Sequence, residues 1–224
     1  MSTAALTKQT ATVSLEKFIK ACPPKGEFFS NNGHLNIYFT GSLNNLRACF
    51  HDSGLPDGVF KRDDALRAMV LPPVADYRYS DNLTPILPLT DSITFSAEPF
   101  FELLEFAAYG DVRYYLNSVL ATPEHGGKLV ATNGHIMRMV SMPQAAKLAA
   151  PVIVPRELLE LALKCKAETL EIQAEKGMTG AVSFMAGQVY AQCRGIDAKF
   201  PDYMRVIPAR IAQCETGRNM AQSC

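Results

Sequence analysis

The stretch DVRYYLNSVLATPEHGGKLVATNGHIMRMVSM, residues 111–142, decides the fold of this chain. We expect three strands in it, over 112–120, 128–132 and 136–142, because apolar and polar residues alternate there. The loop TPEHGG separates the first two strands, and the corner ATNGH separates the second from the third. Asn-Gly is a strong signal for a short hairpin connection. The stretch therefore predicts an antiparallel meander of three strands.

A strand and a helix are expected just before this meander. SITFS, residues 92–96, reads as the strand, and Ser96 and Pro99 are residue types found where helices begin. Gly110 is expected to end the helix. Within 97–109, apolar residues recur with the spacing of one buried helical face, namely Phe100, Leu103, Leu104, Ala107 and Ala108.

The same order of elements follows in the second half of the chain. VIVPRELLELALKC, residues 152–165, predicts a strand that runs into a helix, with Pro155 at the helix start. Three alternating strands, TLEIQAE, AVSFMA and VYAQCRG, come after it. The order β-α-β-β-β therefore occurs twice. This repeat predicts an α+β fold in which two helices lie side by side on one curved antiparallel sheet.

The first ninety residues predict fewer elements. SLEKFIKAC reads as a short helix capped by Ser14, and HLNIYFTG and NLRACFH read as two strands. RDDALRAMVL is compatible with one more helix, and the proline-rich segment 72–89 with an extended linker. Residues 1–10 are expected to form a floppy terminus.

A second informative segment is AKFPDYMRVIP, residues 198–208. Pro201 and Pro208 interrupt it, so an extended segment is expected rather than a helix. It carries large apolar residues and Arg205. Taken alone, it is equally well explained as a linker that leaves a domain.

The composition is that of an ordinary globular protein without a recognisable catalytic centre. The 224 residues are 48% hydrophobic with a formal net charge of +0, so any DNA contact must come from a local patch or from topology. The six cysteines form no CxxC pair, and we expect reduced thiols in a cytoplasmic protein. The four histidines lack metal-ligand or nucleophile–base spacing, so we predict no enzyme, no metal site and no cofactor. No apolar run is long enough to predict a membrane span.

Four segments occur together in an order and spacing that resemble one known domain: RYYLN, VATNGH, VIVPRELLELAL and KFPDYMRVIP. They resemble the middle domain of the bacterial DNA polymerase III beta subunit, the sliding clamp, over residues 91–208. The resemblance implies the DNA-clamp (processivity) fold for 91–208. Residues 1–90 would be a divergent or trimmed clamp-like module, and residues 209–224 a flexible tail. A viral origin and a truncated homologue are both left open.

The resemblance also implies a function and a site. Members of the family form a ring around duplex DNA, tether a polymerase, and bind short linear peptides of polymerases and clamp loaders in a surface pocket. Ile136 stands where the family usually has a charged residue, so a more apolar pocket is expected, and the chain leaves no room for the family's third domain. By position, the pocket would be lined by Leu116, Thr132, Gly134, His135, Ile136, Met137, Pro201, Arg205 and Val206.

DNA contact would come from basic residues on the helices and nearby loops. The candidates are Arg138, Lys147, Arg156, Lys164 and Lys166. Glu98, Glu102 and Glu105 lie on the outward face of the first helix and oppose a phosphate backbone. Each cation is at least equally well explained as a solvated surface charge.

Two functions follow from these observations. The first is a sliding-clamp-like processivity factor that closes as a homo-oligomer, with a trimer of two-domain subunits as the expected ring. The second is a clamp-derived binding module, or a clamp mimic, that captures clamp-binding peptides without encircling DNA. The acidic helix face and the missing third domain favour the second.

Overall fold

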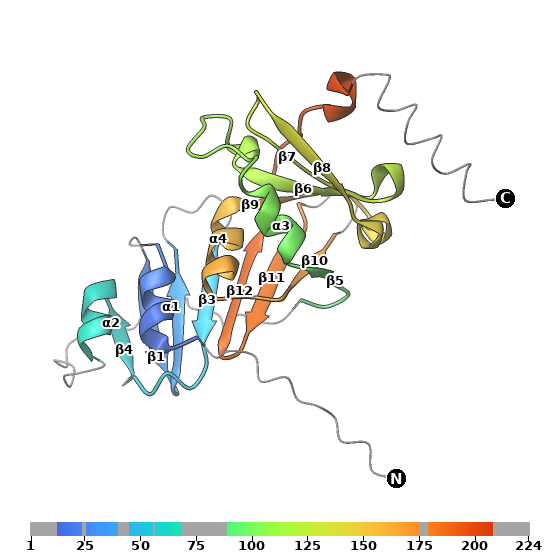
Figure 1. Cartoon of the computed structure of the whole chain (residues 1–224). Helices are drawn as coiled ribbons and strands as arrows, with labels where there is room; N and C mark the ends of the chain where they lie inside the picture. The colour runs from blue at the N-terminus through green and yellow to red at the C-terminus, as the bar shows by residue number, and fades with distance from the viewer. Residues whose placement is uncertain are drawn as a thin grey trace, which may run out of the picture.

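The computed structural model describes residues 13–23, 26–39, 45–55, 57–68, 89–174 and 179–207. The strands of these residues form two antiparallel sheets (Figure 1). One sheet has eight strands in the order β4-β1-β2-β3-β12-β11-β10-β5, and the other has four in the order β8-β7-β6-β9. Within this part of the chain, no helix is long and apolar enough to cross a membrane. Residues 1–12, most of the predicted linker and the tail from residue 208 lie outside the described residues.

The predicted β-α-β-β-β repeat is present. Its first half consists of β5 Ile93–Ser96, α3 Glu98–Leu103, β6 Ser118–Thr122, β7 Lys128–Thr132 and β8 Met137–Ser141. Its second half consists of β9 Val152–Pro155, α4 Arg156–Lys164, β10 Thr169–Gln173, β11 Ala181–Ala186 and β12 Val189–Arg194. The α+β fold class and the repeated unit are therefore confirmed.

The two halves exchange their first strands. β5 pairs with β10 of the second half, where Phe95 lies opposite Leu170. β9 pairs with β6 of the first half, where Ile153 lies opposite Leu120. The strands of the repeat consequently lie in two sheets rather than one, and each half depends on the other to complete its sheet. Sequence periodicity could not show this, because pairing between distant strands leaves no local signal.

Helices α3 and α4 lie next to each other against the sheets (Figure 1). The spacing of apolar residues in 152–165 predicts that Leu158, Leu159, Ala162 and Cys165 face the core, and all four are buried. Leu161 of α4 is buried as well. From α3, Phe100 packs edge-on against Phe95 of β5, with ring centroids 6.0 Å apart. This core holds the halves together and fixes the positions of the loops at the ends of the strands.

Helix α3 is shorter than the predicted 97–109. It ends at Leu103, and Ala97, not Ser96, is its N-cap. The apolar residues that follow are nevertheless buried, as predicted, in turns rather than in a helix: Leu104, Ala107 and Ala108. Arg156 explains the difference, because its guanidinium donates hydrogen bonds to the carbonyl oxygens of these same three residues. The Ala108 amide donates to the Leu116 carbonyl oxygen, so Arg156 satisfies the Leu104 carbonyl oxygen that a longer helix would have bonded internally.

The N-terminal region contains α1 Leu15–Ala21, β1 Glu27–Asn31, β2 His34–Tyr38, β3 Arg47–Phe50, β4 Gly58–Phe60 and α2 Arg62–Ala68. The predicted capped helix and the two predicted strands are confirmed, and the side chain of Ser14 accepts a hydrogen bond from the Lys17 amide. Strands β1 and β4 were not predicted. In β1, Phe28, Phe29 and Ser30 are buried in succession, so the strand lacks the alternation by which strands are recognised.

The N-terminal strands join the repeat through β3, which pairs antiparallel with β12 so that Ala48 lies opposite Ala191. The run α1-β1-β2-β3 has the same α-β-β-β order as α3-β6-β7-β8 and α4-β10-β11-β12. The described N-terminal elements therefore have the order of the later unit without its first strand. A division of the chain at residue 90 stays a prediction.

Candidate functional site: an apolar notch between the Asn-Gly corner and the strap

The residues predicted to form a pocket surround a hollow of ≈ 670 Å³, which we call the notch. Three segments meet there: the short 3₁₀ turn Tyr114–Leu116, the β7–β8 corner, and residues 196–207, which we call the strap. The volume lies within the range of sites that accept small ligands or peptide side chains. The lining residues are Arg113, Tyr115, Leu116, Thr132, Gly134, His135, Ile136, Met137, Met139, Pro201, Asp202, Tyr203, Val206 and Ile207.

The corner is held by its own side chains. Oδ1 of Asn133 accepts hydrogen bonds from the amides of His135 and Ile136, at 2.9 and 3.0 Å. The hydroxyl of Thr132 donates to the Ile136 carbonyl oxygen at 2.7 Å and accepts from the Gly134 amide at 3.0 Å. Residues 133–136 thus form a four-residue loop, longer than the short Asn-Gly connection that the sequence suggested. The loop presents Ile136 to solvent with 51% of its surface exposed.

Arg113 lies over this corner and is fixed by Asp111. The carboxylate of Asp111 accepts from Nε and Nη2 of Arg113 at 3.0 and 2.7 Å, and from its amide at 2.8 Å. These hydrogen bonds lower the pKa of Asp111 to about 2. A Cβ atom at Gly134, whose φ is +91°, would lie only 3.2 Å from the Arg113 guanidinium nitrogens. Glycine is therefore needed at 134 both for its backbone conformation and for the approach of Arg113.

The segment RYYLN does not form the predicted strand. Tyr114–Leu116 is a 3₁₀ turn, and β6 begins only at Ser118. The side chain of Asn117 accepts a hydrogen bond from the Asp111 amide and donates one to the Asp111 carbonyl oxygen, so it closes the loop. Such side-chain-to-backbone bonding competes with strand pairing. Leu116 is only 1% exposed, so it forms the buried floor of the notch.

The strap covers the outer face of the four-stranded sheet. Tyr203 packs there in a small cluster of buried residues that includes Leu120, Val130 and Ile153. Residues Tyr203–Val206 form a 3₁₀ turn, which corrects the prediction of a fully extended segment. The hydroxyl of Tyr114 donates to the Asp197 carbonyl oxygen at 3.3 Å and so links the strap to the first turn. The strap is therefore a packed wall of the notch.

The structure brings together every predicted notch residue except one. Arg205 is exposed and is not among the described residues that line the notch. Arg113 supplies the cation there instead. Sequence reasoning missed it, although the pairing of Asp111 and Arg113 two residues apart was a usable signal. Met139 was also missed, yet its position two residues after Met137 on one strand places both on the same face.

The notch combines an apolar floor and rim with a small number of polar groups. Ile136 and Val206 are exposed at its rim, with Val206 at 69%. Among the described lining residues, Arg113, Asp202 and His135 supply a guanidinium, a carboxylate and an imidazole, and Tyr115 and Tyr203 supply phenol groups. The described part of the chain holds no cluster of three or more His, Cys, Asp or Glu side chains placed to bind a metal ion. An apolar hollow with a few polar groups at its rim has the general form of a ligand site.

The predicted DNA-binding cations do not share one role. Arg156 is mostly buried, with 16% of its side chain exposed, and it pairs with Glu160 at 3.1 Å. Lys164 donates to the Ala21 carbonyl oxygen at 3.4 Å, and Arg138 lies 3.7 Å from Glu102. Lys147 and Lys166 are exposed. Phosphate binding by these cations stays a prediction, and the structural contacts of Arg156 speak against its inclusion.

Comparison with known proteins places these features in context. No protein-family model matches this chain. The beta sliding clamp of Salmonella typhimurium is 36% identical over 105 residues, which are 45% of this chain and 28% of that protein. The beta sliding clamp of Caulobacter vibrioides is 36% identical over 108 residues, which are 44% of this chain and 28% of the relative. The chain thus spans less than a third of the length of these curated relatives.

Solved structures give the same result for the fold. The DNA polymerase III subunit beta of Pseudomonas aeruginosa superposes with a TM-score of 0.59 at 20% identity, covering 86% of this chain and 64% of that one. The Caulobacter crescentus pol III beta superposes with a TM-score of 0.60 at 21% identity, covering 87% and 67%. The resemblance to the beta sliding clamp and the DNA-clamp fold are therefore confirmed.

Proposed function

We propose that this chain is a sliding-clamp-like processivity factor that binds short peptides of DNA polymerases and clamp loaders in the notch. In this proposal it acts by binding, not as an enzyme. The observation that carries it is the notch itself. Segments more than sixty residues apart in the sequence converge there, and they are the segments on which the resemblance to the clamp rests.

The size and chemistry of the notch support weak, exchangeable peptide binding. A buried floor at Leu116 and an apolar rim at Ile136 and Val206 fit a Leu or Phe side chain. Burying about 100 Å² of apolar surface contributes about 2.5 kcal/mol before entropic costs. Affinity of this order suits a platform whose partners must replace one another.

The peptide proposal is tested by fluorescence polarisation with a labelled peptide that carries a Leu-Phe anchor. Val206→Asp places a charge at the exposed rim, so we expect binding to weaken at least about tenfold without loss of folding. Met185→Asp is the matched control, because Met185 is also exposed, at 61%, but lies on β11 outside the notch. Equal affinities for the two variants would contradict the assignment of the notch.

Assembly around DNA is the second part of the proposal. Strand β8 is the outer strand of its sheet among the described residues, whereas β12, its counterpart in the second half, is covered by β3. An uncovered strand of this kind can pair with another subunit. Light scattering after size exclusion should give a homo-oligomer, with a trimer expected. A monomer at all concentrations would contradict a ring.

The alternative is a clamp-derived module that binds peptides but does not encircle DNA. The exposed carboxylates of α3 and its C-terminal turn, Glu98, Glu102 and Glu105, favour it, because negative charges repel a phosphate backbone. Retention on circular DNA, measured beside peptide binding, separates the two. Peptide binding without retention on the circle selects the alternative.

A further inference from the structure

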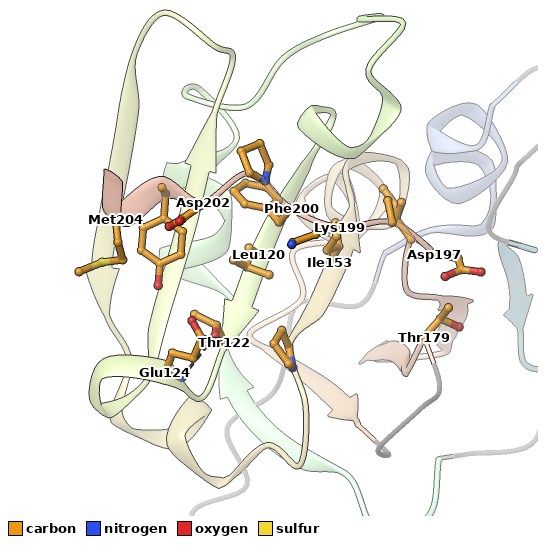
Figure 2. A pocket seen from close by; sticks show the side chains of 15 residues that line it. Leu120, Thr122, Glu124, Ile153, Thr179, Asp197, Lys199, Phe200, Asp202 and Met204 are labelled. Carbon is orange, nitrogen blue, oxygen red and sulfur yellow. Dashed lines mark hydrogen bonds between the residues drawn. The ribbon is translucent and has the colours of Figure 1, made fainter. Parts of the chain in front are cut away.

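Residues of the strap that line the notch also line a second hollow of ≈ 640 Å³, whose lining residues are drawn in Figure 2. We call it the second hollow. Its floor is formed by Leu120 of β6 and Ile153 of β9, and Phe200 of the strap covers part of it. Figure 2 shows Glu124 at one side, Asp197 with Thr179 at the opposite side, and Leu120 and Ile153 between them. Carboxylates therefore lie on both sides of this apolar floor, and Figure 2 also shows Lys199 close to Ile153.

The charges of the second hollow differ from those of the notch. Among the described residues that line it, three carboxylates, those of Glu124, Asp197 and Asp202, face one cation, Lys199. All four residues are exposed, so a solute can reach them. The second hollow is thus acidic, whereas the charge of Arg113 in the notch is already paired with Asp111.

Tyr203 provides an independent observation that points to a ligand. It lines both hollows and is only 6% exposed, yet its hydroxyl has no hydrogen-bond partner among the described residues. Burial, followed by the nearby carboxylates of Glu124 and Asp202, raises the pKa of this hydroxyl. The phenol is therefore neutral, with an unused donor and an unused acceptor beside two anions. Buried polar groups are normally satisfied, so such an atom indicates a missing partner.

We propose that the second hollow binds a basic flank of the same peptide whose apolar anchor fills the notch. The proposal rests on the proposed function and adds a specificity to it. Lys or Arg side chains carry only donors, which match the three exposed carboxylates. Their aliphatic stems match the apolar floor at Leu120 and Ile153.

Continuity between the two hollows supports a single occupant. Pro201, Asp202 and Tyr203 of the strap line both hollows. These three residues therefore form a short wall between the notch and the second hollow. An extended peptide rises about 3.3 Å per residue, so a few residues beyond the anchor suffice to cross this wall. The anchor supplies apolar affinity, and the flank supplies discrimination between partners.

The test compares three labelled peptides that share one Leu-Phe anchor. One carries two Lys or Arg residues on each side of the anchor, one carries Ser at these positions, and one carries Glu. With the full chain, we expect the basic peptide to bind about three- to tenfold more tightly than the serine peptide, and the acidic peptide more weakly. The gain should shrink as salt is raised from 50 to 500 mM, because the carboxylates are exposed.

Variants assign the effect to the second hollow. Glu124→Gln combined with Asp197→Asn should abolish the preference for the basic peptide and leave the serine peptide unaffected. Glu105→Gln is the control, since Glu105 is an exposed carboxylate outside both hollows. In heteronuclear spectra, the basic peptide should shift the amides of Thr122 and Thr179, which the serine peptide leaves unchanged.

Two outcomes would overturn the inference. If the three peptides bind equally, or if the preference for the basic peptide survives in the double variant, the second hollow does not select peptides by charge. The proposed function is unaffected by either outcome. If none of the three binds, the proposed function fails together with the inference. Binding of the serine peptide therefore separates the failure of one from the failure of both.

Discussion

Arg113 owes its position to Asp111, two residues before it, and this short contact organises the rim of the notch. The carboxylate accepts three hydrogen bonds from one residue, including two from the guanidinium. Bidentate pairs of this kind have a defined geometry as well as a favourable energy. The cation is therefore presented at a fixed place over Gly134.

The first prediction contrasts the two arginines near the strap. Arg113→Ala should weaken binding of a Leu-Phe peptide by about fivefold or more, because an oriented cation and part of the rim are lost. Arg205→Ala should change the affinity by less than about twofold, since Arg205 does not line the notch. Fluorescence polarisation on both variants measures this. A larger loss of affinity in Arg205→Ala than in Arg113→Ala would support the sequence-based prediction that Arg205 lines the pocket.

The second prediction concerns pH. The pKa of Asp111 is lowered from 3.8 to about 2 by its hydrogen bonds with Arg113. Because the folded pKa is depressed, the stabilisation is complete above the unfolded value and is lost as pH falls from 3.8 towards 2. A titration of the Asp111 carboxyl ¹³C signal should therefore show the group ionised at pH 3. A midpoint near the ordinary aspartate value would contradict the contact, and Arg113→Ala should restore that value.

Much of the notch could be predicted at the residue scale, because the corner and the strap are short and locally determined. Asn133, Thr132 and Gly134 close the corner by contacts within four residues. The unsatisfied hydroxyl of Tyr203 could not be predicted, since burial and the lack of a partner arise only when the strap packs on the sheet.

At the scale of elements, the helices and most strands follow from periodicity, and the exceptions have identifiable causes. The segment around Tyr114 has the alternation of a strand, but Asn117 bonds the Asp111 backbone and closes a turn. Just after the end of helix α3, Arg156 bonds the carbonyl oxygens of Leu104 and Ala107. In each case, one side chain overrides the local pattern.

The third prediction tests the cap on α3. Arg156→Ala removes donors from the carbonyl oxygens of Leu104, Ala107 and Ala108, so we expect a loss of about 2 kcal/mol in the free energy of unfolding. Arg194→Ala, at an exposed arginine on β12, should cost less than about 0.5 kcal/mol. Urea unfolding followed by circular dichroism measures both. If both variants lose the same free energy of unfolding, Arg156 behaves as an exposed surface charge. That result would be compatible with a role of Arg156 in DNA binding.

At the scale of the whole molecule, one sheet runs through the N-terminal strands and the repeat. β3 and β12 pair at its centre, with Ala48 opposite Ala191. The two regions should consequently unfold as one cooperative unit.

The fourth prediction tests this coupling. Ala191→Pro removes an amide donor from a strand that pairs on both sides, so the cost should be about 3 kcal/mol or more. Hydrogen exchange followed by mass spectrometry should show loss of protection in β2 and β3 as well as in β10 and β11. If β2 and β3 keep their protection, the N-terminal strands are an independent unit.

By itself, the sequence determined the repeated β-α-β-β-β order, the buried faces of the helices and the residues of the corner. These properties depend on spacings of two to four residues, which a chain carries locally. The tertiary structure alone decided the exchange of β5 and β9 between the halves, the joining of β3 to β12, and the division of the outer surface into two hollows by the strap. Those properties depend on pairings between residues far apart in the chain, and the free energy of such pairings is set by packing rather than by local pattern.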